Sequence, residues 1–232
     1  MSSDALSVRL RARLGAFELD VAFEVPAGIT VLFGPSGSGK SSTCAAIAGL
    51  LTPAAGRVSL GETTWFDSER RVDVAPEGRS LSLVFQSLAL FPHLTALGNV
   101  EYGIERNVPA AERGRRALAM LERMRVGHVG ARFPRTFSGG EAQRVALARA
   151  FVRNPRAVLL DEAFSALDPE LRIALGADVR ALVTELRIPA IVVTHHRREA
   201  RRLGERAVSL RDGRVVASGP VRDVLPSEDA DD

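Results

Sequence analysis

Apolar and polar side chains alternate at the start of the chain, as they do in a strand that buries one of its two faces. In residues 17–25 every odd-numbered side chain is apolar, and residues 7–14 alternate in a similar way. This pattern predicts two antiparallel strands that pack one face on a core and expose the other to solvent.

Farther along, short apolar runs of strand length alternate with segments in which apolar residues follow helical spacing. Strands are expected at residues 29–33, 57–60, 81–85, 157–160 and 190–193, with a closing hairpin of residues 207–210 and 215–218 that turns at Asp212-Gly213. Helices are expected at residues 40–51, 141–153, 171–186 and 199–203. Strands that alternate with helices predict a mostly parallel sheet covered on both faces.

Residues 87–134 differ in character from the segments on either side. Helix-forming residues dominate, apolar side chains recur at helical spacing within residues 117–124, and Arg and Glu crowd the remaining positions. We interpret this segment, together with the start of the next helix, as a helical subdomain of about residues 87–150 that is inserted into an α/β core.

The composition is that of a globular protein, since 46% of the 232 residues are hydrophobic and 25% are charged. The length predicts one domain of residues 1–226, followed by an acidic tail of residues 227–232. The single cysteine, Cys44, excludes a disulfide within this chain. No apolar run of about 18 residues is present, and residues 1–10 lack a signal-peptide segment, so any membrane role is expected to come through a partner. The net charge of +3 gives no reason to expect nucleic acid.

A phosphate-binding loop follows the strand predicted at residues 29–33. Its sequence, Gly34-Pro35-Ser36-Gly37-Ser38-Gly39-Lys40-Ser41, matches the pattern G-x-x-x-x-G-K-[ST], and Ser42 continues into the predicted helix. The glycines let successive N–H groups point at phosphate oxygens, and the helix adds the positive end of its dipole. Lys40 is expected between the outer phosphates of ATP, and the Ser41 hydroxyl on Mg²⁺. A chance Gly/Ser loop is the alternative, but the flanking strand and helix favour a P-loop NTPase core.

Two carboxylates, Asp161 and Glu162, follow the apolar run of residues 157–160. Ligands of open α/β sheets bind at the carboxyl ends of the strands, where this pair is expected to lie. We predict that Asp161 holds Mg²⁺ through water, and that Glu162 is the general base for the water that attacks the γ-phosphate. A solvated acidic pair that caps the next helix is the alternative; the phosphate loop favours the catalytic interpretation.

The segment Phe137-Ser138-Gly139-Gly140-Glu141-Ala142-Gln143-Arg144 resembles the signature segment of ABC-transporter nucleotide-binding subunits. Other motifs of that family occur in the same order along the chain. Gln86 resembles the Q-loop glutamine, Ser165-Ala166-Leu167-Asp168 resembles the D-loop, and His195 resembles the switch histidine. The resemblance covers residues 7–224, nearly the whole chain.

This resemblance implies a RecA-like core with an antiparallel β subdomain and an inserted helical subdomain. It also implies that the chain pairs head to tail with a second nucleotide-binding subunit, as a homodimer, around two ATP molecules. Ser138, Gly139 and Gly140 would then contact the γ-phosphate bound by the opposite chain, and Asp168 would join the nucleotide contacts. Taken alone, Ser138-Gly-Gly would be an ordinary helix cap.

The resemblance also implies the roles of three further side chains. His195 would hydrogen-bond the γ-phosphate and the attacking water, although a lone histidine is more often structural. Gln86 would contact Mg²⁺ and report the nucleotide state to the helical subdomain. Together with Glu162 and Lys40, these residues complete the predicted catalytic set.

The sequence departs from the family pattern at several positions. Ala163 stands where importers commonly have proline, His196-Arg197-Arg198 replaces the commoner acidic residues, and Phe137 replaces leucine. The position that stacks on adenine in the family corresponds to Leu14, with Phe17 nearby. Adenine stacking and selectivity against GTP are therefore expected to be weak.

Two segments resemble importers. Residues 90–100 resemble the part of oxyanion, iron and polyamine importers that faces a cytoplasmic helix of the membrane subunit, although Leu88, Leu90 and Phe91 could instead be core. Residues 61–84 resemble molybdate-type subunits most closely. Many such subunits carry a C-terminal regulatory domain, which we expect to be absent here.

The importer resemblance implies ATP-driven import of molybdate or another oxyanion through membrane permease subunits, with a substrate-binding protein as an indirect partner. The chain is then expected at the cytoplasmic face of the inner or plasma membrane. An importer of iron, polyamine or sugar, an exporter subunit, and a non-transport ABC ATPase remain alternatives. A small-molecule kinase is a further alternative, against which Ser138-Gly-Gly argues.

Overall fold

The strands of the described chain join in one hydrogen-bonded sheet. The computed structural model describes residues 5–164 and 167–226. The strands are β1 (Leu6–Leu14), β2 (Phe17–Val25), β3 (Gly28–Phe33), β4 (Ala55–Leu60), β5 (Thr63–Asp67), β6 (Val72–Asp73), β7 (Leu81–Val84), β8 (Ala157–Asp161), β9 (Pro189–Thr194), β10 (Arg206–Arg211) and β11 (Arg214–Pro220). The helices are α1 (Lys40–Ala48), α2 (Ala96–Glu101), α3 (Ala110–Arg123), α4 (Gly139–Phe151), α5 (Pro169–Leu186), α6 (Arg197–Leu203) and α7 (Val221–Val224).

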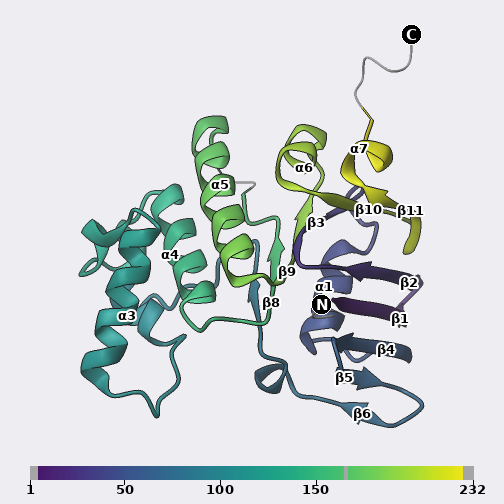
Figure 1. Ribbon diagram of the computed structural model, residues 1–232, viewed down its shortest axis with the longest axis horizontal. Helices are drawn as coiled ribbons and strands as arrows, with labels where there is room; N and C mark the ends of the chain where they lie inside the picture. Colours follow the sequence, from purple (N-terminus) through teal and green to yellow (C-terminus); the bar gives the residue numbers. More distant parts are fainter. Residues whose placement is uncertain (1–4, 165–166, 227–232) are drawn as a thin grey trace.

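The sheet has a parallel part and an antiparallel part (Figure 1). Its strand order is β6-β5-β4-β1-β2-β11-β10-β3-β9-β8-β7. The strands from β10 to β7 are parallel to their neighbours, whereas those from β6 to β2 are antiparallel. β11 joins the two parts, because it is antiparallel to β10 and meets β2 in parallel at Arg214 and Asp20. The predicted α/β class is confirmed, but the sheet is less parallel than the alternation of strands and helices indicated.

Several boundaries differ from the sequence-based expectation. The helix expected at residues 40–51 ends at Ala48, because Gly49 adopts a φ of 80° and its backbone N–H bonds back to the last turn. The helix expected from residue 141 begins at Gly139, since Ser138 is its N-cap. β5, β6 and α7 were not expected; β6 and α7 are too short for a hydrophobic period to reveal them.

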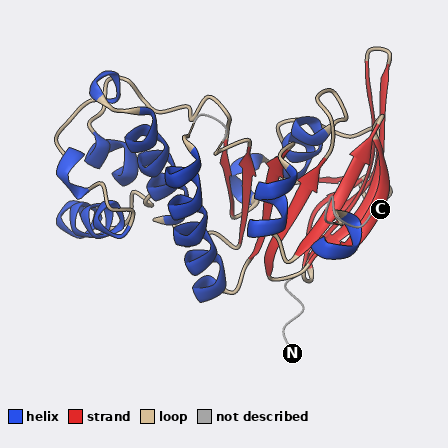
Figure 2. Cartoon of the chain, turned by 90° about the horizontal axis from the view of Figure 1, so that it is seen from above, coloured by secondary structure: helices blue, strands red, loops and turns tan. Residues whose placement is uncertain are grey.

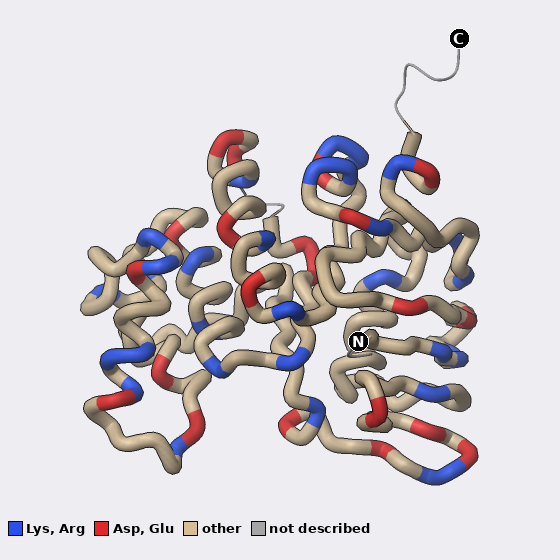
Figure 3. The backbone as a smooth tube through the Cα atoms, in the orientation of Figure 1, with Lys and Arg blue, Asp and Glu red and all other residues tan. Residues whose placement is uncertain are grey.

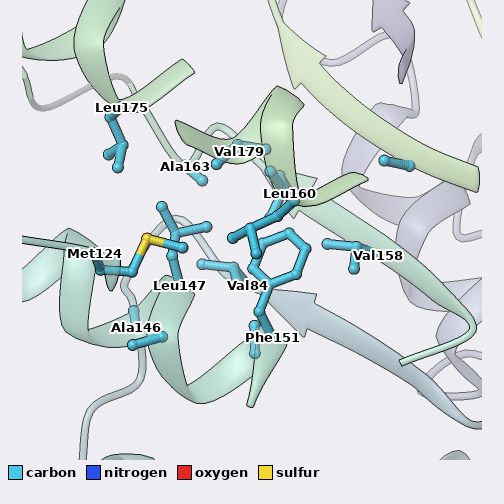
Figure 4. Close-up of a cluster of buried hydrophobic side chains, with 14 of the residues drawn as sticks. Val84, Met124, Ala146, Leu147, Phe151, Val158, Leu160, Ala163, Leu175 and Val179 are labelled. Carbon is cyan, nitrogen blue, oxygen red and sulfur yellow. The ribbon is translucent and has the colours of Figure 1, made fainter. Parts of the chain in front are cut away.

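The parallel strands bury side chains on both faces, which explains why they read as continuous apolar runs. Val158 and Leu160 of β8 pack with Phe151 of α4 in one cluster, part of which is drawn in Figure 4. Leu159 points to the opposite face and packs in a second cluster with Ile47 of α1. α1 therefore lies on the face of the parallel strands that is opposite to α4.

Helices gather at one end of the molecule and strands at the other (Figure 2). Between β7 and β8 the chain, described throughout, forms α2, α3 and α4 with short 3₁₀ turns and no strand. Ala117, Leu121 and Met124 are fully buried against α4 and its neighbours, as the helical spacing predicts. The exact limits of the helical subdomain stay a prediction.

Acidic and basic residues are spread over helices and strands alike, and arginines are dense along α6 (Figure 3). Within the ranges 5–164 and 167–226, none of the helices combines the length and the apolar character that crossing a bilayer requires.

Candidate active site

The predicted site residues follow four strands that end at the same edge of the sheet. Near this edge the strand register pairs Phe33 with Thr194, Val193 with Asp161, and Leu160 with Val84. The loops that carry Gly34, Gln86, Glu162 and His195 therefore begin side by side. This is the edge at which open parallel sheets bind their ligands.

The phosphate loop of residues 34–39 connects β3 with α1. Gly34 passes so close to β10 that a Cβ atom would lie 2.3 Å from the Leu210 carbonyl oxygen. Gly39 caps α1 with a φ of 99°, a conformation that side chains with a Cβ atom disfavour. Both glycines are thus required by the backbone geometry of the loop.

Lys40 is buried beneath the loop. Its Nζ donates to the carbonyl oxygens of Gly34 at 2.9 Å and Pro35 at 2.8 Å. Burial lowers the pKa of Lys40 below its ordinary value, while Glu162 and Asp161 act in the opposite direction. The ammonium therefore lies between the loop carbonyls and the two carboxylates.

Ser41 and Asp161 face each other across the sheet edge. The Ser41 hydroxyl donates to Asp161 Oδ1 at 3.1 Å. Burial is the largest influence on Asp161 and raises its pKa, which the Ser41 hydrogen bond partly opposes. A desolvated carboxylate beside a hydroxyl is a pair of hard oxygen donors, which suits a divalent cation such as Mg²⁺.

Glu162 connects two neighbouring loops. Its Oε2 accepts from Gln86 Nε2 at 3.2 Å, and its Oε1 lies 3.2 Å from His195 Nδ1. Its backbone is left-handed, with a φ of 48°. Strained residues of this kind persist where the surroundings hold them, and they are frequent at active sites. Three of the four predicted catalytic side chains, Gln86, Glu162 and His195, therefore meet in one place.

The loop that carries His195 is fixed by residues that the sequence analysis missed. Thr194 Oγ1 donates to Glu199 Oε2 at 2.7 Å and accepts from the His196 backbone N–H at 3.1 Å. Thr194 and Glu199 are both buried. The spacing of five residues between the strand-terminal Thr194 and Glu199 was the available signal for this hydrogen bond. We had assigned a role in this segment only to His195.

A hollow of about 640 Å³ opens beside the phosphate loop. It is lined by Leu14, Phe17, Ser36, Gly37, Gly39, Lys40, Ser41, Ser42, Gln86 and Glu162. The aromatic ring of Phe17 lies so near the loop that a Cβ atom on Gly39 would be 3.2 Å from its Cζ. The hollow thus brings together the glycine-rich loop, the carboxylate of Glu162 and the aromatic ring of Phe17.

The predicted signature residues and Asp168 lie outside this hollow. Ser138 caps α4 in a capping box with Glu141: Ser138 Oγ accepts from the Glu141 backbone N–H at 3.2 Å, and Glu141 Oε2 accepts from the Ser138 backbone N–H at 2.7 Å. Ser138 and Gly139 are exposed. Asp168 caps α5, and its Oδ1 accepts from the Leu171 backbone N–H at 2.9 Å. Ser165 and Ala166 of the predicted D-loop lie outside the described residues.

The residues present fit a nucleotide with a divalent cation. In the described part of the chain no cluster of three or more His, Cys, Asp or Glu side chains could hold a metal alone. Ser41 and Asp161 supply two oxygen donors, and phosphate oxygens are the usual source of the remaining ligands for Mg²⁺. The buried Ser38 hydroxyl has no hydrogen-bond partner within the described chain. A ligand with acceptor oxygens, such as a phosphate, could therefore satisfy it.

Comparisons with known proteins agree with this geometry. A model of the ABC transporter family matches residues 19–165. The chain is 44% identical over 220 residues to the molybdenum import ATP-binding protein ModC of Rhizobium meliloti (strain 1021), covering 95% of this chain and 61% of that protein. It is 40% identical over 227 residues to ModC of Pseudomonas aeruginosa, covering 97% and 63% respectively.

Solved structures give the same result for the fold. The dimeric structure of MJ0796, a bacterial ABC transporter cassette, superposes with a TM-score of 0.79 at 29% identity, covering 94% of this chain and 99% of that one. A post-hydrolysis state of MJ0796 bound to ADP and Pi matches equally well. The chain spans about three fifths of the length of the curated relatives it matches. With a family model that covers more than half of its residues and a site whose parts follow the family's order, the chain belongs to the ABC transporter family.

Proposed function

We propose that the chain binds ATP with Mg²⁺ and hydrolyses the γ-phosphate with water. The observation that carries this proposal is the meeting of Gln86, Glu162 and His195 beside the phosphate loop. A carboxylate held from two sides above a phosphate cradle is oriented to accept a proton from water. Positioned general bases typically contribute about 10²–10⁴-fold to a rate.

In this mechanism Lys40 and the loop N–H groups bind the triphosphate, and Glu162 accepts the proton of the attacking water. His195 orients Glu162 and would hydrogen-bond the γ-phosphate, while Gln86 donates to the other carboxylate oxygen and its amide oxygen would be a ligand for Mg²⁺. Ser41 and Asp161 would hold Mg²⁺, which neutralises the charge that develops on the phosphate oxygens.

Phe17 is our candidate for the side chain that stacks on the base. Its ring lines the hollow next to the phosphate loop, whereas Leu14 offers no π face. Stacking on an aromatic ring recognises any base, so this contact would add affinity without strong selection of adenine over guanine.

We further propose that two chains pair so that each places Ser138, Gly139 and Gly140 on the nucleotide of the other. The N-terminus of α4 is exposed, and its free N–H groups and dipole suit an anion. The dimeric structure of MJ0796 supports pairing of this kind.

The proposed process is import of molybdate or another oxyanion through a membrane permease. The support is the similarity to ModC proteins, which are named for molybdenum import. A groove of about 840 Å³ between the sheet and the helical end exposes Phe85 and Tyr102 and is our candidate docking place for the permease. Leu88 and Leu90 pack toward the core, whereas Phe91 lines the groove.

Glu162→Gln tests the hydrolysis and pairing proposals together. The variant should bind ATP but hydrolyse it at least about 10²-fold more slowly than the wild type, because the amide cannot accept a proton. With ATP and Mg²⁺ it should elute as a dimer in size-exclusion chromatography. Lys40→Ala is the control and should lose nucleotide binding; a Glu162→Gln protein that stays monomeric with bound ATP would contradict the shared site.

Transport is tested in proteoliposomes that contain a molybdate permease, its binding protein and this chain. Labelled molybdate should accumulate with the wild-type chain and ATP, but not with the Glu162→Gln chain. If the chain hydrolyses ATP without molybdate uptake, but supports uptake of iron, polyamine or sugar through the matching permease, the proposed ATPase activity stands and the proposed substrate is wrong.

A further inference from the structure

The backbone is strained directly after Gln86. Leu88 and Ala89 both adopt left-handed conformations, with φ of 60° and 45°, although neither is glycine. Residues with a Cβ atom disfavour this region, and two in succession persist only where the surroundings hold them. Leu88 packs against the buried cluster around α4, whereas Ala89 is exposed.

A single side chain of α4 holds both strained residues. Arg149 donates from Nη1 to the carbonyl oxygen of Ala89 and from Nη2 to that of Leu88, each at 2.8 Å. Its guanidinium also lies over the ring of Phe91, 5.3 Å from the ring centroid. The planar fork of an arginine therefore fixes two successive carbonyl groups while the ring supports it from the side.

The surroundings of Arg149 indicate a positional role. Burial lowers the pKa of its guanidinium below the ordinary value, and Tyr102 acts more weakly in the opposite direction. Within the described residues, its polar partners are backbone carbonyls and it forms no ion pair with a carboxylate. Burial of a cation without a carboxylate partner costs free energy. We therefore attribute the presence of Arg149 to the positions in which it holds the two carbonyl groups.

The segment is anchored separately on its far side. Asn99 of α2 accepts from the Phe91 backbone N–H at 2.8 Å and donates to the carbonyl oxygens of Phe91 and Leu94, each at 3.1 Å. The turn at residues 88–89 is therefore the part that lies between this anchor and Gln86.

We propose that Arg149 is a positioning residue that ties Gln86 to the helix that begins with the signature glycines. Ten residues, or about 15 Å of helix, separate Gly139 from Arg149. A shift of α4 that follows contact at its N-terminus carries the guanidinium, the two carbonyls and the turn with it. Gln86 and its bond to Glu162 then respond to the opposite chain. This inference rests on the proposed function, in which the N-terminus of α4 contacts that chain's nucleotide.

The test compares Arg149→Met with the double variant Arg149→Met/Ala89→Gly in the full chain. Arg149→Met should lower the rate of ATP hydrolysis at saturating ATP by about 10-fold or more, because misplaced catalytic groups are costly. The Kd for ATP should change by less than about 2-fold, since the phosphate loop is intact. Glycine enters the left-handed region without a Cβ penalty, so the double variant should recover a large part of the rate.

Ala89→Gly alone and Arg115→Met are the controls. Arg115 is exposed on α3, where it pairs with Glu112, and it lies outside both the groove and the turn, so both controls should hydrolyse ATP like the wild type. If Arg149→Met does not fold, Arg149→Lys with and without Ala89→Gly replaces it, since lysine can reach only one carbonyl at a time.

Equal rates for Arg149→Met with and without Ala89→Gly would overturn the inference, because they would assign to Arg149 a purely structural role. A wild-type rate for Arg149→Met would overturn it as well. Failure of the proposed function looks different: the wild-type chain itself would not hydrolyse ATP, or Lys40→Ala would bind nucleotide normally.

Discussion

Oε1 of Glu162 and Nδ1 of His195 lie 3.2 Å apart at the edge of the sheet, although 33 residues separate them along the chain. The second carboxylate oxygen is held at the same distance by Gln86. Both oxygens of the proposed base are thus engaged by loops that leave neighbouring strands. The carboxylate is oriented by the fold itself, which lowers the cost of arranging it when substrate binds.

His195→Ala should slow ATP hydrolysis by about 10²-fold while the Kd for ATP changes little. The imidazole orients Glu162 but contributes little to the grip of the phosphate loop on the triphosphate. Single-turnover hydrolysis and calorimetric titration measure the two quantities. His196→Ala is the matched control: its ring lies tilted against that of His195 with centroids 4.1 Å apart, whereas it is the His195 ring that lies within 3.2 Å of the Glu162 carboxylate. Equal losses in both variants would argue against a specific role for His195.

Phe17→Ala should weaken ATP binding about 10-fold, the scale of one lost base–aromatic stack. Phe17→Tyr should bind ATP like the wild type, because it keeps the ring. Inorganic triphosphate gives the sharpest comparison, since it occupies the phosphate loop and carries no base. Its affinity should be the same in all three proteins. A parallel loss for triphosphate would mean that Phe17 supports the loop through its contact with Gly39 and does not stack on the base.

Arg79 is fully buried at the end of the helix that follows the phosphate loop. Its Nη1 donates to the carbonyl oxygens of Ala46 and Ile47, both at 2.9 Å, and its Nη2 donates to Asp73 Oδ1 at 2.9 Å. Arg79→Met would leave these acceptors unpaired, so we expect the free energy of unfolding to fall by about 3 kcal/mol.

Urea unfolding measures this difference for Arg79. Arg70→Met is the control, because the Arg70 side chain is exposed and its guanidinium lies 3.9 Å from the Asp67 carboxylate. It should change the free energy of unfolding by less than about 0.5 kcal/mol. A similar small change for Arg79→Met would show that neighbouring groups or water replace its hydrogen bonds.

The parts of the site with a fixed spacing could be predicted from the sequence. The phosphate loop and the pair Asp161-Glu162 each need particular side chains at particular intervals, and the structure places them at one sheet edge. Arg79 and Arg149 could not be predicted in their present roles. Both bind backbone carbonyls, which every residue carries, so nothing in the sequence shows which carbonyl will be the partner.

The fold likewise has parts that the sequence predicts and parts that it does not. Alternation and apolar runs predicted the long strands, because burial of a whole face repeats over many residues. The two-residue β6 carries no period, and its pairing with Phe66 and Asp67 depends on how β5 turns back. β11 joins the parallel and antiparallel strands where Arg214 pairs with Asp20, and no local pattern encodes this long-range pairing.

Glu141 should make the stability of the chain depend on pH in the acid range. Its pKa is lowered to about 2, first by the hydrogen bond from the Ser138 backbone N–H and further by His128 and Arg132. Because the pKa of the folded state lies below that of the unfolded state, the ionised group stabilises the fold above about pH 4.5, and this contribution disappears as the pH falls toward 2.

Glu141→Gln separates the charge from the cap, since glutamine can still accept from Ser138. At pH 7 the variant should be less stable than the wild type by at most about 1 kcal/mol, because the group is partly exposed to solvent and the capping contact remains. The difference in unfolding free energy between the two proteins should shrink from pH 4.5 to pH 2, as measured by urea unfolding at several pH values. Curves that stay parallel over this range would assign the stabilisation to the shape of the capping box and not to the carboxylate charge.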